Sequence, residues 1–151
     1  MSEEQRILQI FQSYREVNQE FFRVMKKVAQ KHNLTPLQLI VLRILNRHPA
    51  IRLSELAEKV SLGNSTTSGI VDRMVKADLV SRERTEADRR AMTLTLTEKG
   101  KRLWEASDST RIMMFQPLLG LPEEDQEQFL RIQNEILHIL RQVREDETSH
   151  D

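Results

Sequence analysis

The sequence predicts a mainly α-helical fold with one small β-hairpin, and three observations support this prediction. Apolar residues near both ends of the chain recur every three or four positions, which is the spacing of a helix with one apolar face. The middle reads as a short helix, a turn containing glycine, and a second helix. Between Thr93 and Thr97, threonine and leucine alternate, which is the period of a strand with one buried face.

Composition narrows the class of protein. A chain of 151 residues with 38% hydrophobic and 30% charged residues suits one domain or two small interlocked ones. No run approaches the roughly 20 apolar residues that span a bilayer, and the first residues lack the apolar segment of a signal peptide, so we expect a cytoplasmic protein. The absence of cysteine excludes a disulfide framework, a thiolate zinc site and a cysteine redox sensor.

The two ends of the chain are predicted to form long amphipathic helices. We assign residues 1–33 to an N-terminal dimerisation helix, 101–145 to C-terminal dimerisation helices that include one opened by Pro122, and 146–151 to a disordered tail. The apolar stripes are too broad for both to be buried on a compact middle, so we expect the terminal helices to pack together and to interlock with a second copy as a homodimer. The stripes consist of Ile7, Ile10, Tyr14, Val17, Phe21, Val24 and Val28, and of Phe129, Ile132, Ile136, Leu140 and Val143.

Helix start and stop signals organise the middle of the chain. The run Thr35-Pro36-Leu37-Gln38 is a capping box with proline at the first helical position, and His48-Pro49 ends that helix. Ser54 is expected to cap a shorter helix over residues 53–60, and Ser61-Leu62-Gly63 a tight turn. Either Asn64 or Ser65 should cap a helix that continues to about residue 77. These elements predict a helix-turn-helix.

The second helix of this unit begins with small polar residues, namely Asn64, Ser65, Thr66, Thr67 and Ser68. Together with the unpaired N–H groups of a helix start, they could contact phosphates and base edges in a major groove, although the same run is also simply a good helix cap. Arg73 follows Ser65 by eight positions and can share its face. Gly69 permits close approach, either of nucleic acid or of a neighbouring helix.

The predicted hairpin carries arginine at its tip. Residues 80–85 read as the antiparallel partner of the threonine and leucine strand, and Asp88-Arg89-Arg90 as the charged turn before it, which suits a narrow, negatively charged groove. Residues 34–104 hold 13 Lys and Arg against 8 Asp and Glu, whereas residues 105–151 hold 4 against 11. Ordinary fluctuation produces some segregation of charge, but here the basic segment contains the arginine hairpin.

A helix-turn-helix followed by an arginine-tipped hairpin is a winged helix, and over nearly its whole length the chain resembles the MarR family of bacterial transcriptional regulators. Each part of the likeness is weak alone, but their order and spacing are specific. The parts are Leu34-Thr35-Pro36-Leu37-Gln38, Leu53-Ser54-Glu55-Leu56-Ala57, Ser65-Thr66 with Val71-Asp72-Arg73-Met74, Leu79-Val80-Ser81-Arg82, and Asp88-x-Arg90 leading into Leu94-x-Leu96-Thr97-x-x-Gly100.

The resemblance implies an obligate dimer whose recognition helix enters the major groove and whose wing reaches the adjoining minor groove. The winged domain would occupy residues 34–100, with Arg90 as the minor-groove arginine. Asp88 would brace the wing by pairing with an arginine such as Arg73 or Arg82. Asp78 departs from the pattern, because the family has glycine where this helix ends; aspartate tolerates the left-handed conformation better than most residues.

In this interpretation, different residues supply the affinity for DNA and the specificity for its sequence. Sequence-independent affinity would come from neutralising phosphates with Lys76, Arg82, Arg84 and Arg89, and sequence choice from the start of the recognition helix together with Arg90. Two-fold symmetry predicts an inverted-repeat operator with half-sites about 34 Å apart. The resemblance also suggests a repressor released by a small lipophilic or phenolic effector, at a site including Tyr14, Phe21, Met25, Trp104 and Met113. The apolar segment around Met113 could equally be part of the dimer core instead of lining a ligand site.

Two other classes of function compete with this interpretation. An enzyme is disfavoured because the four histidines lack the spacing of a helical metal pair and no phosphate-binding loop or nucleophile elbow occurs, so we expect neither catalysis nor a cofactor. A dimeric winged-helix interaction module without DNA binding is the alternative, and the basic wing argues against it. Retardation of duplex DNA at low and high salt would separate these classes.

Overall fold

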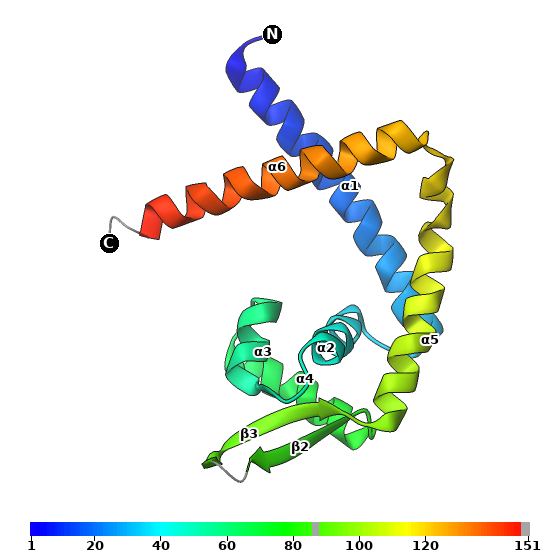
Figure 1. The fold of residues 1–151 in the computed structure, drawn as a ribbon, viewed down its shortest axis with the longest axis vertical. Helices are drawn as coiled ribbons and strands as arrows, with labels where there is room; N and C mark the ends of the chain where they lie inside the picture. The colour runs from blue at the N-terminus through cyan, green and yellow to red at the C-terminus, as the bar shows by residue number, and fades with distance from the viewer. Residues whose placement is uncertain (86–87, 149–151) are drawn as a thin grey trace. The chain divides into compact units, whose positions relative to one another are not determined.

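The computed structural model of the chain describes residues 1–85 and 88–148, and its description of side chains leaves out residues 85 and 88–91. The chain forms two units, Met1–Met114 and Phe115–Asp151, which are described separately. The fold is mainly helical with one small antiparallel sheet, as predicted (Figure 1).

The core of the first unit lies between three helices and the sheet. Helix α2 spans Pro36–Arg47, α3 spans Leu53–Val60 and α4 spans Asn64–Lys76. The predicted capping box of α2 is confirmed, since Gln38 N donates to Thr35 Oγ1 at 3.1 Å and Thr35 N donates to Gln38 Oε1 at 3.1 Å. Each element contributes a fully buried apolar side chain to this core, and the largest are Leu42, Leu56, Met74 and Leu94.

Helix α3 begins one residue before the predicted cap. Leu53 is its first residue, and the N-cap is Arg52, whose side chain makes no capping hydrogen bond. Ser54 therefore lies inside the first turn and is exposed. The reason is that Ile51 and Arg52 are extended and pair with the sheet as strand β1, so the chain turns into the helix directly after them.

The sheet has three antiparallel strands in the order β1-β3-β2, where β1 spans Ile51–Arg52, β2 spans Val80–Thr85 and β3 spans Asp88–Leu96. The bounds predicted for β2 are confirmed. The predicted alternation in β3 is incomplete, because Thr93 and Leu94 are both buried. A central strand has neighbours on both sides, and the Thr93 hydroxyl donates to the Glu83 carbonyl at 3.2 Å.

The sequence predicts a turn at the charged segment 88–90, but in the structure this segment is the beginning of β3. Thr85 pairs with Asp88, whereas Arg84 pairs with Met92, so residues 89–91 lie in a bulge between two paired positions. A bulge of this kind adds local twist and changes the direction of the hairpin arm. Arg89 and Arg90 therefore belong to strand β3, and residues 86–87 lie outside the described ones.

Two long helices complete the first unit. Helix α1, Glu3–Lys31, has a capping box between Ser2 and Gln5, and only its C-terminal end is buried in the core, through Val28 and Ala29. Helix α5, Glu98–Phe115, follows β3. The end of α1 is joined to α5 by a hydrogen bond of 2.8 Å between His32 Nε2 and Thr110 Oγ1.

The second unit contains a short 3₁₀ helix, η1, over Gln116–Gly120 and helix α6 over Glu123–Thr148. Pro122 directly precedes α6 rather than lying in its first turn, and its carbonyl accepts from Gln126 N at 3.0 Å. Helix α6 continues through residues 146–148, so the first half of the expected disordered tail is helical, and residues 149–151 lie outside the described ones. None of the α6 residues is buried.

Candidate nucleic-acid interface

A tight turn joins α3 to α4 and confirms the predicted helix-turn-helix. Ser61 has a left-handed backbone conformation with φ of 57°, and Leu62 N returns to donate to the Ala57 carbonyl at 3.1 Å. Half-buried Leu62 packs against the core. Gly63 then resumes an extended conformation and is the N-cap of α4, so neither Asn64 nor Ser65 is the cap, contrary to the prediction.

The N-terminal end of α4 offers unpaired backbone donors. The first helical hydrogen bond runs from Thr67 N to the Gly63 carbonyl at 3.0 Å. The N–H groups of Asn64, Ser65 and Thr66 therefore precede the hydrogen-bonded part of the helix, and a glycine N-cap has no side chain to satisfy them. All three residues are exposed. A helix end with free N–H groups and exposed hydroxyls is suited to binding a phosphate.

Thr67 does not belong to this exposed end, contrary to the prediction. Its side chain is fully buried, and its hydroxyl donates to the Gly63 carbonyl at 2.9 Å. The helical period explains this position, since Thr67 shares a face with the buried Ile70, Val71 and Met74. Ser68 is half-buried. The residues that remain accessible at the start of α4 are therefore Asn64, Ser65 and Thr66.

Further along α4, one face stays open to solvent. Arg73 and Lys76 are exposed, as the DNA-contacting role requires, and so is Asp72. At Gly69, no described atom lies within 4 Å of the place where a Cβ would be, so packing within this chain does not require glycine there. Of the two alternatives left open for Gly69, close approach of a neighbouring helix finds no support within the chain.

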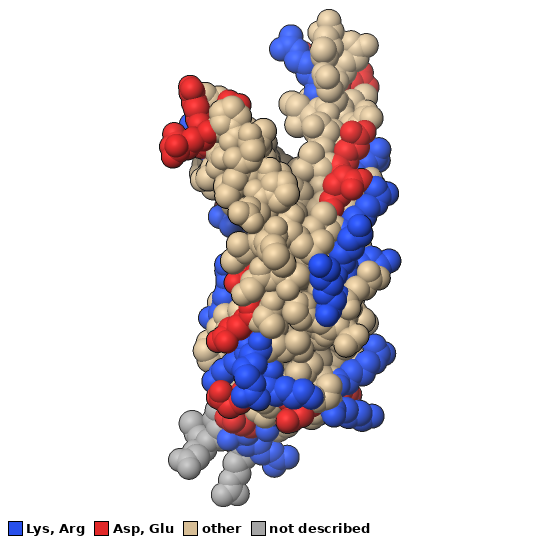
Figure 2. All heavy atoms as spheres, turned by 90° about the vertical axis from the view of Figure 1, so that its right-hand side faces the viewer, with Lys and Arg blue, Asp and Glu red and all other residues tan. Residues whose placement is uncertain are grey.

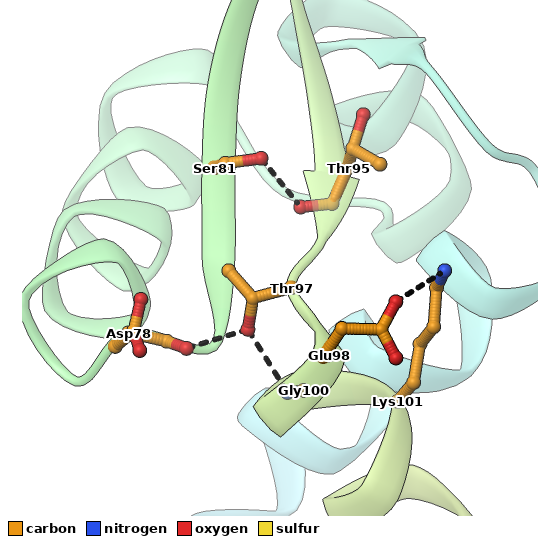
Figure 3. A network of polar contacts seen from close by, with 7 residues as sticks. All are labelled: Asp78, Ser81, Thr95, Thr97, Glu98, Gly100 and Lys101. Atoms are coloured by element: carbon orange, nitrogen blue, oxygen red, sulfur yellow. Dashed lines mark hydrogen bonds and ion pairs between the residues drawn. The ribbon is translucent and has the colours of Figure 1, made fainter.

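A polar network fixes the far end of α4 to the base of the hairpin and to α5 (Figure 3). Asp78 adopts the left-handed conformation expected of it, with φ of 60°. The Thr97 hydroxyl donates to the Asp78 carbonyl at 2.6 Å and accepts from Gly100 N at 3.0 Å. The backbone of Thr97 also donates to the Leu79 carbonyl at 3.1 Å. Thr97 thus joins the C-terminal end of α4, the base of the hairpin and the start of α5.

Gly100 makes this junction possible. A Cβ at this position would lie 2.1 Å from the Leu79 carbonyl oxygen, so only glycine allows α5 to start this close to the segment between α4 and β2. Gly100 belongs to the family pattern, but the sequence around it does not explain why glycine is needed there. No local signal supplies the reason, because the close neighbour is distant in sequence.

Cationic side chains follow the hairpin. Arg82 and Arg84 are exposed on β2. On the face that Figure 2 presents, Lys and Arg predominate over Asp and Glu in the lower half, toward the end where the sheet lies. Arg82 Nη2 donates to Asp72 Oδ1 of α4, an ion pair that the sequence reading missed. The side chains of Asp88, Arg89 and Arg90 lie outside the described residues, so the pairing of Asp88 with Arg73 or Arg82 stays a prediction.

The five residues suggested for an effector site are not all gathered at one cavity. Met25 and Trp104 line a small cavity of about 20 Å³ with Arg43 and Arg111 among its other walls. That volume holds little more than one water molecule. The remaining three are exposed and do not line this cavity; their exposures are 58% for Tyr14, 40% for Phe21 and 60% for Met113.

Side chains inside the cavity wall already interact with one another. Arg111 donates to Asp108 at 2.5 Å, and its guanidinium lies 6.0 Å from the centre of the Trp104 ring. The Nε atom of Arg111 is buried without a hydrogen-bond partner among the described residues. Among residues 1–85 and 88–148, none of the helices combines the length and the apolar composition that a membrane span needs.

Comparisons with known proteins agree with this geometry. The profile of the MarR family matches residues 34–92. The chain is 27% identical over 146 residues to the HTH-type transcriptional regulator MgrA of Staphylococcus aureus, covering 94% of each protein. It is 39% identical over 67 residues to the uncharacterized HTH-type transcriptional regulator YfiV of Bacillus subtilis, a match that spans 44% of this chain and 42% of that protein.

Solved structures share the fold. A MarR family protein from Bacillus stearothermophilus superimposes with a TM-score of 0.84 at 24% identity, covering 93% of this chain and 99% of that one. The Staphylococcus aureus MarR in complex with salicylate and kanamycin gives 0.81 at 22% identity, covering 92% and 95%. The Staphylococcus aureus MepR–DNA complex gives 0.71 at 23% identity, covering 83% and 93%.

Members of this family are transcriptional regulators rather than enzymes. The profile match covers the helix-turn-helix and most of the hairpin, the two segments whose geometry suits nucleic acid. MgrA, which matches over 94% of the chain, is named an HTH-type transcriptional regulator. Residues 34–92 thus match the MarR family of transcriptional regulators, and the chain shares its fold with a solved MarR family protein over 93% of its length.

Proposed function

We propose that this regulator binds an inverted-repeat operator as a homodimer, with α4 in the major groove and the hairpin in the adjoining minor groove. The observation that carries the proposal is that α4, whose N-terminal end is exposed, is joined through its C-terminal end to the base of the basic hairpin at Thr97. A related fold, the MepR–DNA complex, supports the proposal by analogy. Because its target is DNA, we expect the protein in the cytoplasm.

Affinity and specificity would come from different parts of this surface. The unpaired N–H groups of α4 and the cations of α4 and the hairpin would contact phosphates, which positions the protein on the duplex. The exposed side chains of Asn64, Ser65 and Thr66 would read base edges, and Arg90 would read the width of the minor groove. Thr67 is left out of this set because it is buried.

The dimer is proposed from apolar surface that the single chain leaves exposed. On α1, Ile7, Ile10 and Phe11 are more than 60% exposed, and on α6 Leu130 and Leu140 are at least 60% exposed. Helices with this many exposed apolar side chains are rare in monomers, because exposing apolar surface to water is unfavourable in free energy. A second copy that covers these faces would also supply the second hairpin that a two-fold symmetric operator needs.

We further propose that the protein is a repressor released by a small lipophilic or phenolic effector. The support is the salicylate complex of a protein with the same fold. The cavity beside Met25 and Trp104 has room for little more than one water molecule. An effector as large as salicylate would therefore have to widen it. Binding would then favour a conformation that differs from the one that fits the operator.

The experiment that tests DNA binding uses a duplex selected from a random pool by the protein itself. Arg90→Ala should weaken binding by about 1–3 kcal/mol, measured by fluorescence anisotropy at fixed salt. Arg6→Ala is a control of matched charge, because the N-terminal end of α1 lies at the opposite end of the first unit from the hairpin (Figure 1). Unchanged binding by Arg90→Ala would remove the hairpin from the mechanism, and failure to select any duplex would favour an interaction module without DNA binding.

A further inference from the structure

The ion pair between Asp72 and Arg82 places an acid on the surface proposed to face DNA. Asp72 lies seven residues after Ser65 and four before Lys76, so the three share one face of α4. Its side chain is 50% exposed. A carboxylate on this surface repels phosphates, which argues for a compensating role.

Arg82 occupies a particular place on the hairpin. Arg82 lies opposite Leu94 across the two strands and two residues after Val80, so the three side chains lie on the same face of the hairpin. Leu94 and Val80 are buried, so this face turns toward the core. The Arg82 guanidinium nevertheless reaches Asp72 at the surface and is 34% exposed. Beyond Arg82, the register of the hairpin shifts between Arg84 and Thr85. Of the polar links between helix and hairpin described here, this ion pair lies nearest to the hairpin tip.

We propose that Asp72 is a positioning residue for DNA binding: it holds Arg82 against α4 and thereby sets the angle at which the hairpin leaves the recognition helix. This inference rests on the proposed function. The Thr97 junction and the pairing of β3 with β1 hold the base of the hairpin as far as Thr93. The ion pair joins β2 directly to α4 at this level, and we assign to it the angle of the arm beyond Arg82.

Holding Arg82 also leaves part of it available to DNA. A guanidinium has five N–H donors, and the contact to Asp72 uses one nitrogen, Nη2. The other donors of this partly exposed side chain can contact a phosphate while Asp72 fixes its orientation. A pre-oriented arginine loses less rotational freedom when it binds phosphate than a mobile one.

The test exploits the sign of the charge change. Asp72→Asn removes a negative charge from the DNA-facing surface, and electrostatics alone would tighten binding. The proposal requires the opposite, a rise in Kd of roughly tenfold at fixed salt, because the hairpin loses its direction in both halves of the dimer. Glu83→Gln is the matched control: it removes the same charge from an exposed position next to Arg82, and its Kd should stay the same or fall.

A double-mutant cycle identifies the route of the effect. If Asp72 acts only through Arg82, Asp72→Asn should add no penalty to Arg82→Gln. Hydroxyl-radical footprinting at saturating protein should show that Asp72→Asn loses minor-groove protection at the flanks of the site and keeps the central protection. Thermal unfolding should be nearly unchanged, because an exposed ion pair contributes little to stability.

Three results would overturn the proposal. Equal or tighter binding by Asp72→Asn would show that the pair has no positioning role. An equal penalty in both Arg82 backgrounds, confined to one C·G base pair, would show instead that Asp72 reads cytosine directly. Full flank protection in the Asp72→Asn footprint would show that the hairpin keeps its place without the pair. A wild-type protein that binds no duplex would refute the proposed function itself, a distinct outcome.

Discussion

Replacing Gly100 by alanine should destabilise the protein, although alanine is the better helix former. Gly100 has no positive φ, so its backbone does not demand glycine. The added Cβ would lie 2.1 Å from the Leu79 oxygen, and real Cβ atoms stay at least 3.0 Å from such a neighbour, so the start of α5 must move by about 0.9 Å, the difference of these distances. Because the neighbouring atom is a backbone oxygen and not the end of a flexible side chain, it cannot move aside without displacing the chain around Leu79.

The expected size follows from three contributions. Overpacking a close contact costs about 1–3 kcal/mol. Displacing Thr97, whose N–H donates to the same Leu79 oxygen, weakens one hydrogen bond worth about 1 kcal/mol. The higher helix propensity of alanine offsets up to about 1 kcal/mol of this loss. We therefore expect a net loss of about 2 kcal/mol, which for a chain of this size lowers the Tm by roughly 4–8 °C.

The assay is thermal unfolding followed by circular dichroism at one fixed chain concentration. Gly69→Ala is the matched control, because it makes the same substitution in a helix where a Cβ meets nothing within 4 Å. It should raise stability by about 0.5–1 kcal/mol. If Gly100→Ala proves as stable as Gly69→Ala, α5 does not pack against Leu79 and the junction at Thr97 is wrongly described.

Two further predictions concern the exposed and buried sides of α4 and the apolar face of α1. Thr67→Val should cost about 0.5–1.5 kcal/mol of stability by removing the hydroxyl bond to Gly63, yet leave DNA affinity unchanged, whereas Thr66→Ala should weaken DNA binding without lowering the Tm. A loss of DNA affinity in Thr67→Val alone would show that its hydroxyl is accessible in the complex. Phe11→Glu, at a position 61% exposed in the single chain, should convert a dimer into monomers in analytical ultracentrifugation, and an intact dimer would exclude this face from the interface.

Features encoded locally could be predicted from the sequence. The capping box at Thr35 and Gln38 and the ends of β2 each depend on residues within a few positions of one another. The left-handed conformation of Asp78 is expected from the resemblance, because the family has glycine at that place. The helix-turn-helix follows from the same local signals. Thr67 could also have been placed correctly, because it stands three, four and seven residues before Ile70, Val71 and Met74, whereas its polar character suggested a surface role.

Features that depend on tertiary approach could not be predicted. Strand β1 has two residues, too few to show a period, and exists because Ile51 pairs with Leu94. The need for Gly100 arises from a carbonyl 21 positions earlier, at Leu79. The pairing of Asp72 with Arg82 joins a helix to a strand, and the sequence offered Asp88 as an equally reasonable partner for the arginine. In each case, the fold rather than the local sequence brings the two groups together.

The central claim is that two chains present two basic hairpins and two recognition helices to one duplex. The most direct test is a titration of the selected operator at several salt concentrations, with the stoichiometry measured in the same samples. We expect two chains per duplex and a loss of affinity of roughly a thousandfold or more between about 50 and 200 mM salt, because the hairpin and helix cations of both chains displace counterions. One chain per duplex, or an affinity that salt does not change, would contradict the account.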